Sequence, residues 1–160
     1  MSALLQISVA PLTSAPVLLV SPDPADSCYL REILGNLDSE LVSAGDLRSA
    51  KRFLGDGSFR VVITERDLPD GDWLSVLCTV EGLEHPPLLI VISRLADERL
   101  WVEVLNRSGF DVLPKPFVHS EVCRVLGYAL RKRTNMVSKP PARSERESRL
   151  RWASAGLRAC

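Results

Sequence analysis

Five short apolar runs alternate with five amphipathic segments between residues 16 and 133, and this alternation limits the possible folds more than any other feature. The apolar runs predict strands at 16–21, 40–45, 59–64, 87–93 and within 111–117. The segments between them predict helices at 24–37, 46–54, 71–83, 96–108 and 119–133. Strands that alternate with helices pair in parallel through right-handed crossovers. The order therefore predicts a doubly wound α/β domain, with a five-stranded parallel sheet and helices on both faces.

Aspartates mark several of the expected helix starts. Asp23 precedes a proline, which is the pattern of an N-cap followed by a first-turn proline. Asp46 is placed to begin the second helix. We expect Asp67 and Asp70 to cap or tighten the turn after the third strand, with Asp70 and Gly71 beginning the third helix.

The charge distribution divides the chain into an acidic body and a basic tail. Nine Lys and Arg stand against two Glu from residue 131 to residue 160, although the whole chain has a net charge of zero. Periodicity stops near residue 134. We therefore expect a flexible leader at 1–15, one domain at 16–133 and a basic, disordered tail at 134–160.

Other features exclude several classes of protein. No apolar run reaches the roughly 18 residues that a membrane-spanning helix needs, so we expect a cytoplasmic protein without a membrane contact. The four cysteines form no CxxC pair, so no zinc site is indicated. The sequence has no glycine-rich phosphate loop and no nucleophile–base pair, so we do not expect an enzyme.

Polar residues follow four of the expected strands, where ligands bind in sheets of this kind. The segments that contain them are "LVSPDPAD", "ITERDLPDG", "IVIS" and "GFDVLPKPF". In this order and spacing, they resemble the receiver domain of bacterial two-component response regulators. The resemblance covers about residues 16–133 and implies a flavodoxin-like fold and a role in a phosphorelay.

The resemblance also implies a role for each strand-end position. In such receivers, two acids after the first strand bind Mg²⁺ together with an acceptor aspartate after the third strand. Here the two acids are replaced by Ser21 and Pro22, and the aspartate is replaced by Glu65. Ser93 and Lys115 match the hydroxyl and the ammonium that contact the phosphoryl group.

These departures predict a weak or absent Mg²⁺ site, no other cofactor and a poor phosphoacceptor. Asp23 is one residue beyond the acid pair and is expected to cap the first helix. Val112 occupies the position of the family's switch aromatic. We expect Glu65 to form a salt bridge with Lys115. A glutamate that reached both Lys115 and Ser93 would partly imitate a phosphorylated aspartate, although Ser93 could equally bond to the backbone.

Three functions remain open. The first is a pseudo-receiver that binds a protein partner, or a second copy, independently of phosphate. Its contact face would be the fourth helix, fifth strand and fifth helix, including Trp101, Val102 and Leu105, although Trp101 could equally belong to the core. The second is an atypical receiver that still accepts phosphate. The third, less favoured because the body is acidic, is nucleic-acid binding through the basic tail.

Overall fold

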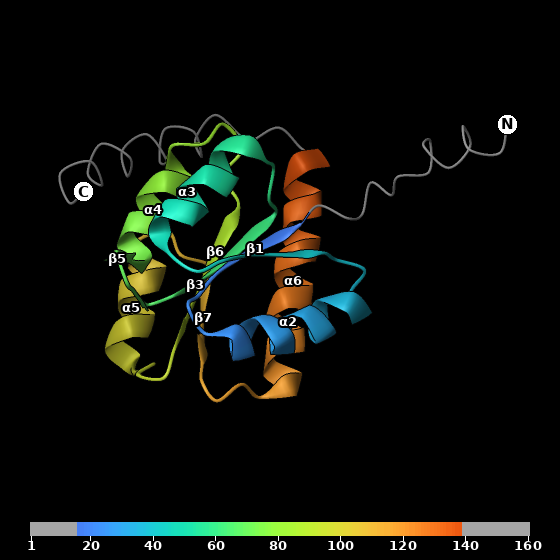
Figure 1. Ribbon diagram of the computed structural model, residues 1–160. Coiled ribbons are helices and arrows are strands. Elements are labelled where there is room, and N and C mark those ends of the chain that lie inside the picture. The colour runs from blue at the N-terminus through green and yellow to red at the C-terminus, as the bar shows by residue number, and fades with distance from the viewer. Residues whose placement is uncertain (1–15, 139–160) are drawn as a thin grey trace, which may run out of the picture.

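The computed structural model describes residues 16–138, with side chains to residue 132. The expected leader at 1–15 and the tail from residue 139 lie outside the described residues, and so does any nucleic-acid contact through that tail. Within 16–138, five strands form one parallel sheet, as predicted, and their order in the sheet is β2-β1-β3-β6-β7 (Figure 1). The strands are β1 (Val17–Val20), β2 (Leu41–Ala44), β3 (Val61–Glu65), β6 (Leu88–Ser93) and β7 (Asp111–Pro114).

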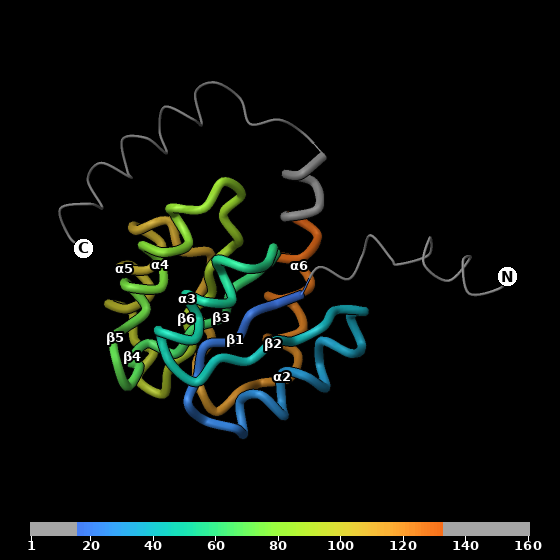
Figure 2. The backbone as a smooth tube through the Cα atoms, turned by 45° about the horizontal axis from the view of Figure 1, so that its top comes forward, coloured from blue at the N-terminus to red at the C-terminus, as the bar shows by residue number. Residues whose placement is uncertain are grey.

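Helices cover both faces of this sheet, as the sequence predicts. The helices are α2 (Pro24–Asn36), α3 (Leu47–Asp56), α4 (Trp73–Glu81), α5 (Glu98–Asn106) and α6 (His119–Ser138). Helices α3, α4 and α5 lie on one face, and α2 and α6 lie on the other (Figure 1 and Figure 2). Helix α6 continues five residues past its expected end at 133. No helix in the described part of the chain is both long and apolar enough to cross a bilayer.

The strands are apolar on both sides because two cores sandwich the sheet. In β1, Leu18 and Val20 point into the core under α3, α4 and α5, whereas Val17 and Leu19 point into the core under α2 and α6. All four residues are at most 1% exposed. Complete burial of such a side chain stabilises the fold by about 1.5–3 kcal/mol. Because both sides of each strand are buried, the strand sequences are apolar at successive positions and do not alternate with polar residues.

Aspartate side chains cap the N-termini of four helices. Asp23 accepts a hydrogen bond from the Ala25 N–H in α2, as predicted, and Asp46 accepts one from the Ser49 N–H in α3. The expected start of the third helix at Asp70 and Gly71 is corrected. Helix α4 begins at Trp73, and its cap is Asp72, which accepts from the Ser75 N–H at 3.0 Å.

A small hairpin separates β3 from α4 and was not predicted. Strand β4 (Asp67–Leu68) pairs antiparallel with β5 (Gly71–Asp72). Asp70, in the turn between them, accepts hydrogen bonds from the backbone N–H groups of Leu47 and Arg48 at 2.8 and 3.1 Å. Asp70 therefore caps α3, a helix distant in sequence, because the hairpin contacts the N-terminus of that helix.

The sheet topology determines where a ligand site can lie. From β1 the chain moves outward to β2 and then crosses to β3 on the other side of β1. The connections after β1 and β3 therefore diverge to opposite sides, which leaves a crevice beyond the carboxyl ends of these two strands. Ser21 follows β1 and Glu65 ends β3, so both lie at this switch point.

Candidate functional site

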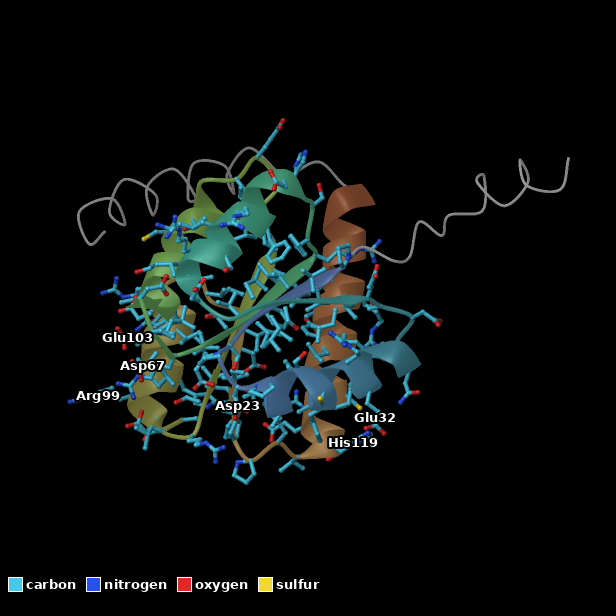
Figure 3. The ribbon with its side chains drawn as sticks, in the orientation of Figure 1. Asp23, Glu32, Asp67, Arg99, Glu103 and His119 are labelled. Carbon is cyan, nitrogen blue, oxygen red and sulfur yellow. The ribbon has the colours of Figure 1, made fainter. Side chains whose placement is uncertain are left out.

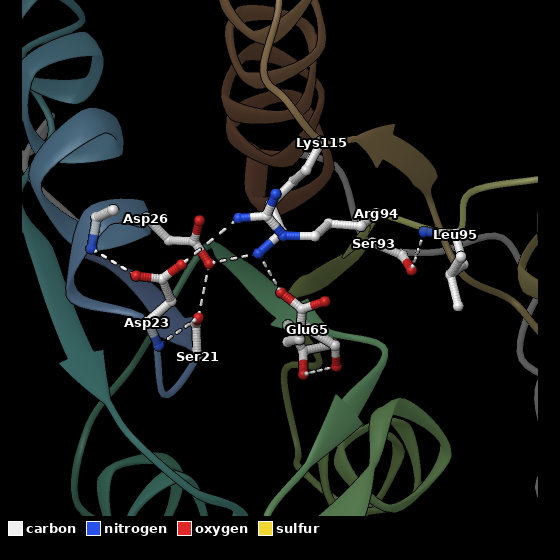
Figure 4. Close-up of polar contacts among 10 residues, drawn as sticks. Ser21, Asp23, Asp26, Glu65, Ser93, Arg94, Leu95 and Lys115 are labelled. Atoms are coloured by element: carbon white, nitrogen blue, oxygen red, sulfur yellow. Dashed lines mark hydrogen bonds and ion pairs between the residues drawn. The ribbon is translucent and has the colours of Figure 1, made fainter.

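Lys115 lies at the centre of the polar groups at the strand ends (Figure 4). Its Nζ is 2.6 Å from Oε2 of Glu65 and 2.9 Å from Oδ2 of Asp26. The Lys115 side chain is only 6% exposed. The salt bridge that the sequence predicts between Glu65 and Lys115 is therefore present, and a second carboxylate completes an Asp26–Lys115–Glu65 triad.

Asp26 is the site residue that sequence reasoning missed. It lies in the first turn of α2 and is 4% exposed. Its Oδ2 accepts a hydrogen bond from Ser21 Oγ at 2.7 Å as well as the bond from Lys115. A signal was available: Asp26 precedes the buried Leu30 by four residues, so it continues the inward-facing stripe of α2.

The residues that replace the family's acid pair provide no carboxylate. Ser21 is buried, and its Oγ donates to Asp26 and accepts from the backbone N–H of Asp23 at 3.2 Å. Pro22 is exposed. The Asp23 carboxylate caps α2 and lies 4.0 Å from the guanidinium of Arg94, and neither contact is with a residue of the triad (Figure 4).

Ser93 is at the end of β6 and is 3% exposed. Its Oγ accepts a hydrogen bond from the Leu95 N–H at 3.0 Å. Among the described residues, no hydrogen bond joins Ser93 to Glu65. The Glu65 side chain therefore contacts the lysine of the predicted site and not the hydroxyl, and Ser93 has the backbone contact that the sequence left open.

The triad holds two carboxylates against one ammonium, and burial and the contacts with Lys115 together shift its pKa values. Burial raises the pKa of Glu65, and the Lys115 hydrogen bond and charge only partly oppose the rise. Burial alone would lower the pKa of Lys115, but its bonds to Glu65 and Asp26 outweigh burial and raise the pKa. Lys115 thus keeps its proton, and its charge is shared between the two carboxylates.

No group of three or more His, Cys, Asp or Glu residues within the described chain could hold a metal ion. The two carboxylates that come closest to forming one, those of Asp26 and Glu65, both bond to Lys115. The ammonium neutralises one of these two negative charges and hydrogen-bonds to an oxygen of each carboxylate.

The positions expected at the partner face differ in burial. Val112, at the switch-aromatic position, is fully buried in the sheet. Trp101 is half-buried and packs against the core, whereas Val102 and Leu105 on α5 are 52% and 50% exposed. Figure 3 shows Arg99 and Glu103 pointing away from the sheet on the same helix.

Comparisons with known proteins relate this arrangement to signalling regulators. No protein-family model matches the chain. The chain is 26% identical to the DNA-binding transcriptional regulator NtrC of Azospirillum brasilense over 87% of its own length and 29% of the relative. It is 24% identical to the response regulator protein PilR of Pseudomonas aeruginosa, over 89% of the chain and 31% of the relative. The chain thus spans less than a third of these two relatives.

Solved structures show the same fold. The signal receiver domain of an HD domain-containing protein from Pseudomonas fluorescens superposes with a TM-score of 0.68 at 23% identity, over 76% of this chain and 98% of that one. The beryllofluoride-activated receiver domain dimer of NtrC4 superposes with a TM-score of 0.69 at 21% identity, over 74% of this chain and 98% of that one. The sheet order and these structural neighbours show that the chain has the fold of receiver domains, and the sequence relatives that it resembles are response regulators.

Proposed function

We propose that this chain is a phosphorylation-independent receiver, a cytoplasmic signalling module and not an enzyme, that acts by binding protein. The observation that carries the proposal is the Asp26–Lys115–Glu65 triad, in which Lys115 bonds to both carboxylates at 2.9 and 2.6 Å. In a working receiver, this lysine pairs with the phosphoryl group. Here the protein's own side chains already provide the anionic partner.

The surroundings of Glu65 also oppose phosphoryl transfer. Phosphoryl transfer depends on charge neutralisation and on an attacking oxygen held in line. Glu65 is one methylene longer than aspartate, and its Oε2 bonds to the ammonium. Ser21 and Pro22 provide no carboxylate for Mg²⁺, whose affinity rises with the number of charged oxygen ligands. An acceptor with no metal and an engaged oxygen is expected to react slowly.

The contact surface proposed for a partner, or for a second copy, is the face formed by α5, β7 and α6. Exposed Val102 and Leu105 support it, since exposed apolar side chains gather at interfaces. On α6, Tyr128 is 54% exposed and stacks on Phe110, with ring centroids 5.7 Å apart. The relative NtrC4 has a receiver that forms a dimer in its activated form.

Incubation with acetyl phosphate and Mg²⁺, followed by intact mass measurement, tests the proposal. We expect no phosphoryl adduct on the wild-type chain. A matched variant, S21D/P22D/E65D, restores the three carboxylates and should gain an adduct under the same conditions. A stoichiometric adduct on the wild-type chain that is absent from Glu65→Gln would contradict the proposal and show an atypical, working phosphoacceptor.

A further inference from the structure

Helix α3 has an exposed basic face, although the domain as a whole is acidic. Its buried side is formed by Leu47, Ala50 and Leu54. Arg48, Lys51 and Arg52 are exposed and follow one another at helical spacing. Between residues 16 and 132 the chain has 13 Lys and Arg and 18 Asp and Glu, so this basic face stands on an acidic body.

The three cations have no ion-pair partner among the side chains of residues 16–132. The nearest N-terminal acids, Asp46 and Asp70, accept hydrogen bonds from backbone N–H groups at the beginning of α3. A further acid, Asp56, follows Arg52 by one turn and makes no ion pair with it within the described chain. Hydrogen bonds from Ser49 lower the pKa of Asp46, and the charges of Arg48 and Arg52 add to this effect. No ion pair engages any of the three cations within residues 16–132, so each can still meet an anion from outside.

The arrangement is unfavourable for the helix alone. Arg48 and Arg52 are four residues apart, where like charges repel. Arg48 is also in the first turn, where the helix dipole disfavours a positive charge. The charge of Asp46 interacts with Arg48 and Arg52 and offsets part of this repulsion, whereas Lys51 makes no ion pair within residues 16–132.

We propose that the basic face of α3, formed by Arg48, Lys51 and Arg52, binds an acidic peptide segment of a partner protein. Phe53 supports a peptide over a nucleic acid, because this residue follows Arg52, is 37% exposed and offers an apolar contact that a phosphate backbone does not use. The net negative charge of the body repels any polyanion that extends over it, which favours a short acidic segment confined to α3 over a long nucleic acid.

This surface is separate from the proposed α5–β7–α6 face. Helix α3 packs beside β1 and β2, whereas α5 packs beside β7 at the opposite edge of the sheet (Figure 1). A chain with contact surfaces at both edges would join two partners. The inference does not depend on whether Glu65 accepts phosphate, so it can fail or hold independently of the proposed function.

Fluorescence anisotropy with a labelled peptide of Glu and Leu residues tests the site on the full chain at low salt. We expect R48Q/K51Q/R52Q to weaken binding by about tenfold or more, since three charge contacts are lost. The matched control is R146Q/R149Q/R151Q, which removes the same charge from the basic tail and should bind like the wild type. Glutamine keeps helix propensity, and circular dichroism checks the fold.

Three results would overturn the proposal: no peptide binding at low salt, equal loss in both variants, or greater loss in the tail variant. Displacement of the peptide by a DNA duplex that binds through Arg48 would assign the face to nucleic acid instead. Amide chemical-shift mapping on the wild-type chain gives a result that needs no variant. Shifts are expected within 47–56, and their absence there would also overturn the site.

Discussion

Lys115 is the residue on which the site depends, because it bonds to both carboxylates of the triad. Removing it leaves Asp26 and Glu65 facing each other at 5% and 17% side-chain exposure. A buried charge without its partner costs far more than the pair contributes. The lysine thus acts as an internal counter-ion that lowers the free-energy cost of burying the two carboxylates.

We expect Lys115→Met to lower the free energy of unfolding by about 3–5 kcal/mol at neutral pH. Urea denaturation monitored by circular dichroism measures the change. The matched control is Glu65→Gln, which keeps the shape of the acid and leaves Lys115 with Asp26, and should change stability by less than about 1.5 kcal/mol. An equal loss in both variants would contradict the role of Lys115 as counter-ion.

The pH dependence of Lys115→Met follows from the sign of the pKa shifts. Burial already raises the pKa of Glu65 above its ordinary value of 4.5, and loss of Lys115 removes the opposing contribution. The folded variant then binds protons more tightly than its unfolded chain, so its stability rises as pH falls toward the ordinary value. The deficit relative to the wild type should therefore shrink at mildly acidic pH. A deficit that grows on acidification would contradict this account.

At the scale of elements, the hairpin of β4 and β5 links the end of β3 to the beginning of α3. Asp70 provides the link through its two bonds to backbone N–H groups of α3. Gly71 allows the close approach, because a Cβ at this position would lie 2.8 Å from Cδ2 of Leu47. The hairpin that follows β3 and Glu65 is therefore hydrogen-bonded to α3, the helix that precedes β3 in the chain.

Asp70→Ala is expected to destabilise the domain by about 1–2 kcal/mol, because α3 loses a cap on two of its N–H groups. Thermal unfolding measures the loss. Asp67→Ala is the control in the same hairpin, since the Asp67 side chain is 77% exposed and makes only a long ion pair with Arg66. Similar melting temperatures for the two variants would show that the Asp70 bonds contribute nothing to stability.

At the scale of the molecule, two apolar cores leave few large apolar side chains exposed, and several of those lie on α5 and α6. Val102, Leu105 and Tyr128 are 52%, 50% and 54% exposed. Substitution of such positions should leave the cores intact. They therefore allow binding and stability to be tested separately.

We expect V102E/L105E to abolish self-association in sedimentation velocity while it changes stability by less than about 0.5 kcal/mol. Phe53→Glu is the control, since it places a charge at an exposed position on α3 and should leave self-association unchanged. If the variant associates like the wild type, the α5–β7–α6 face is not the interface. A wild-type chain that stays monomeric at high concentration would contradict a homodimer on this face.

The order of strands and helices and the parallel sheet were predictable from the sequence alone. The Glu65–Lys115 pair was predictable only because that order places both residues at the carboxyl ends of strands. Periodicity, helix caps and short strand-end motifs are local, so they can be read within a few residues. The start of α4 was misplaced by two residues because the sequence does not distinguish a capping Asp72 from a capping Asp70.

Only the tertiary structure decided which distant groups meet. Asp26 and Lys115 are 89 residues apart in the chain, and Asp70 and Leu47 are 23 apart. Both contacts depend on how the helices are placed on the sheet, and spacing along the chain does not report that placement. The sequence places Ser21, Pro22 and Glu65 at the ends of two strands. Only the fold shows that Lys115 is buried there between Glu65 and an aspartate from the first turn of α2.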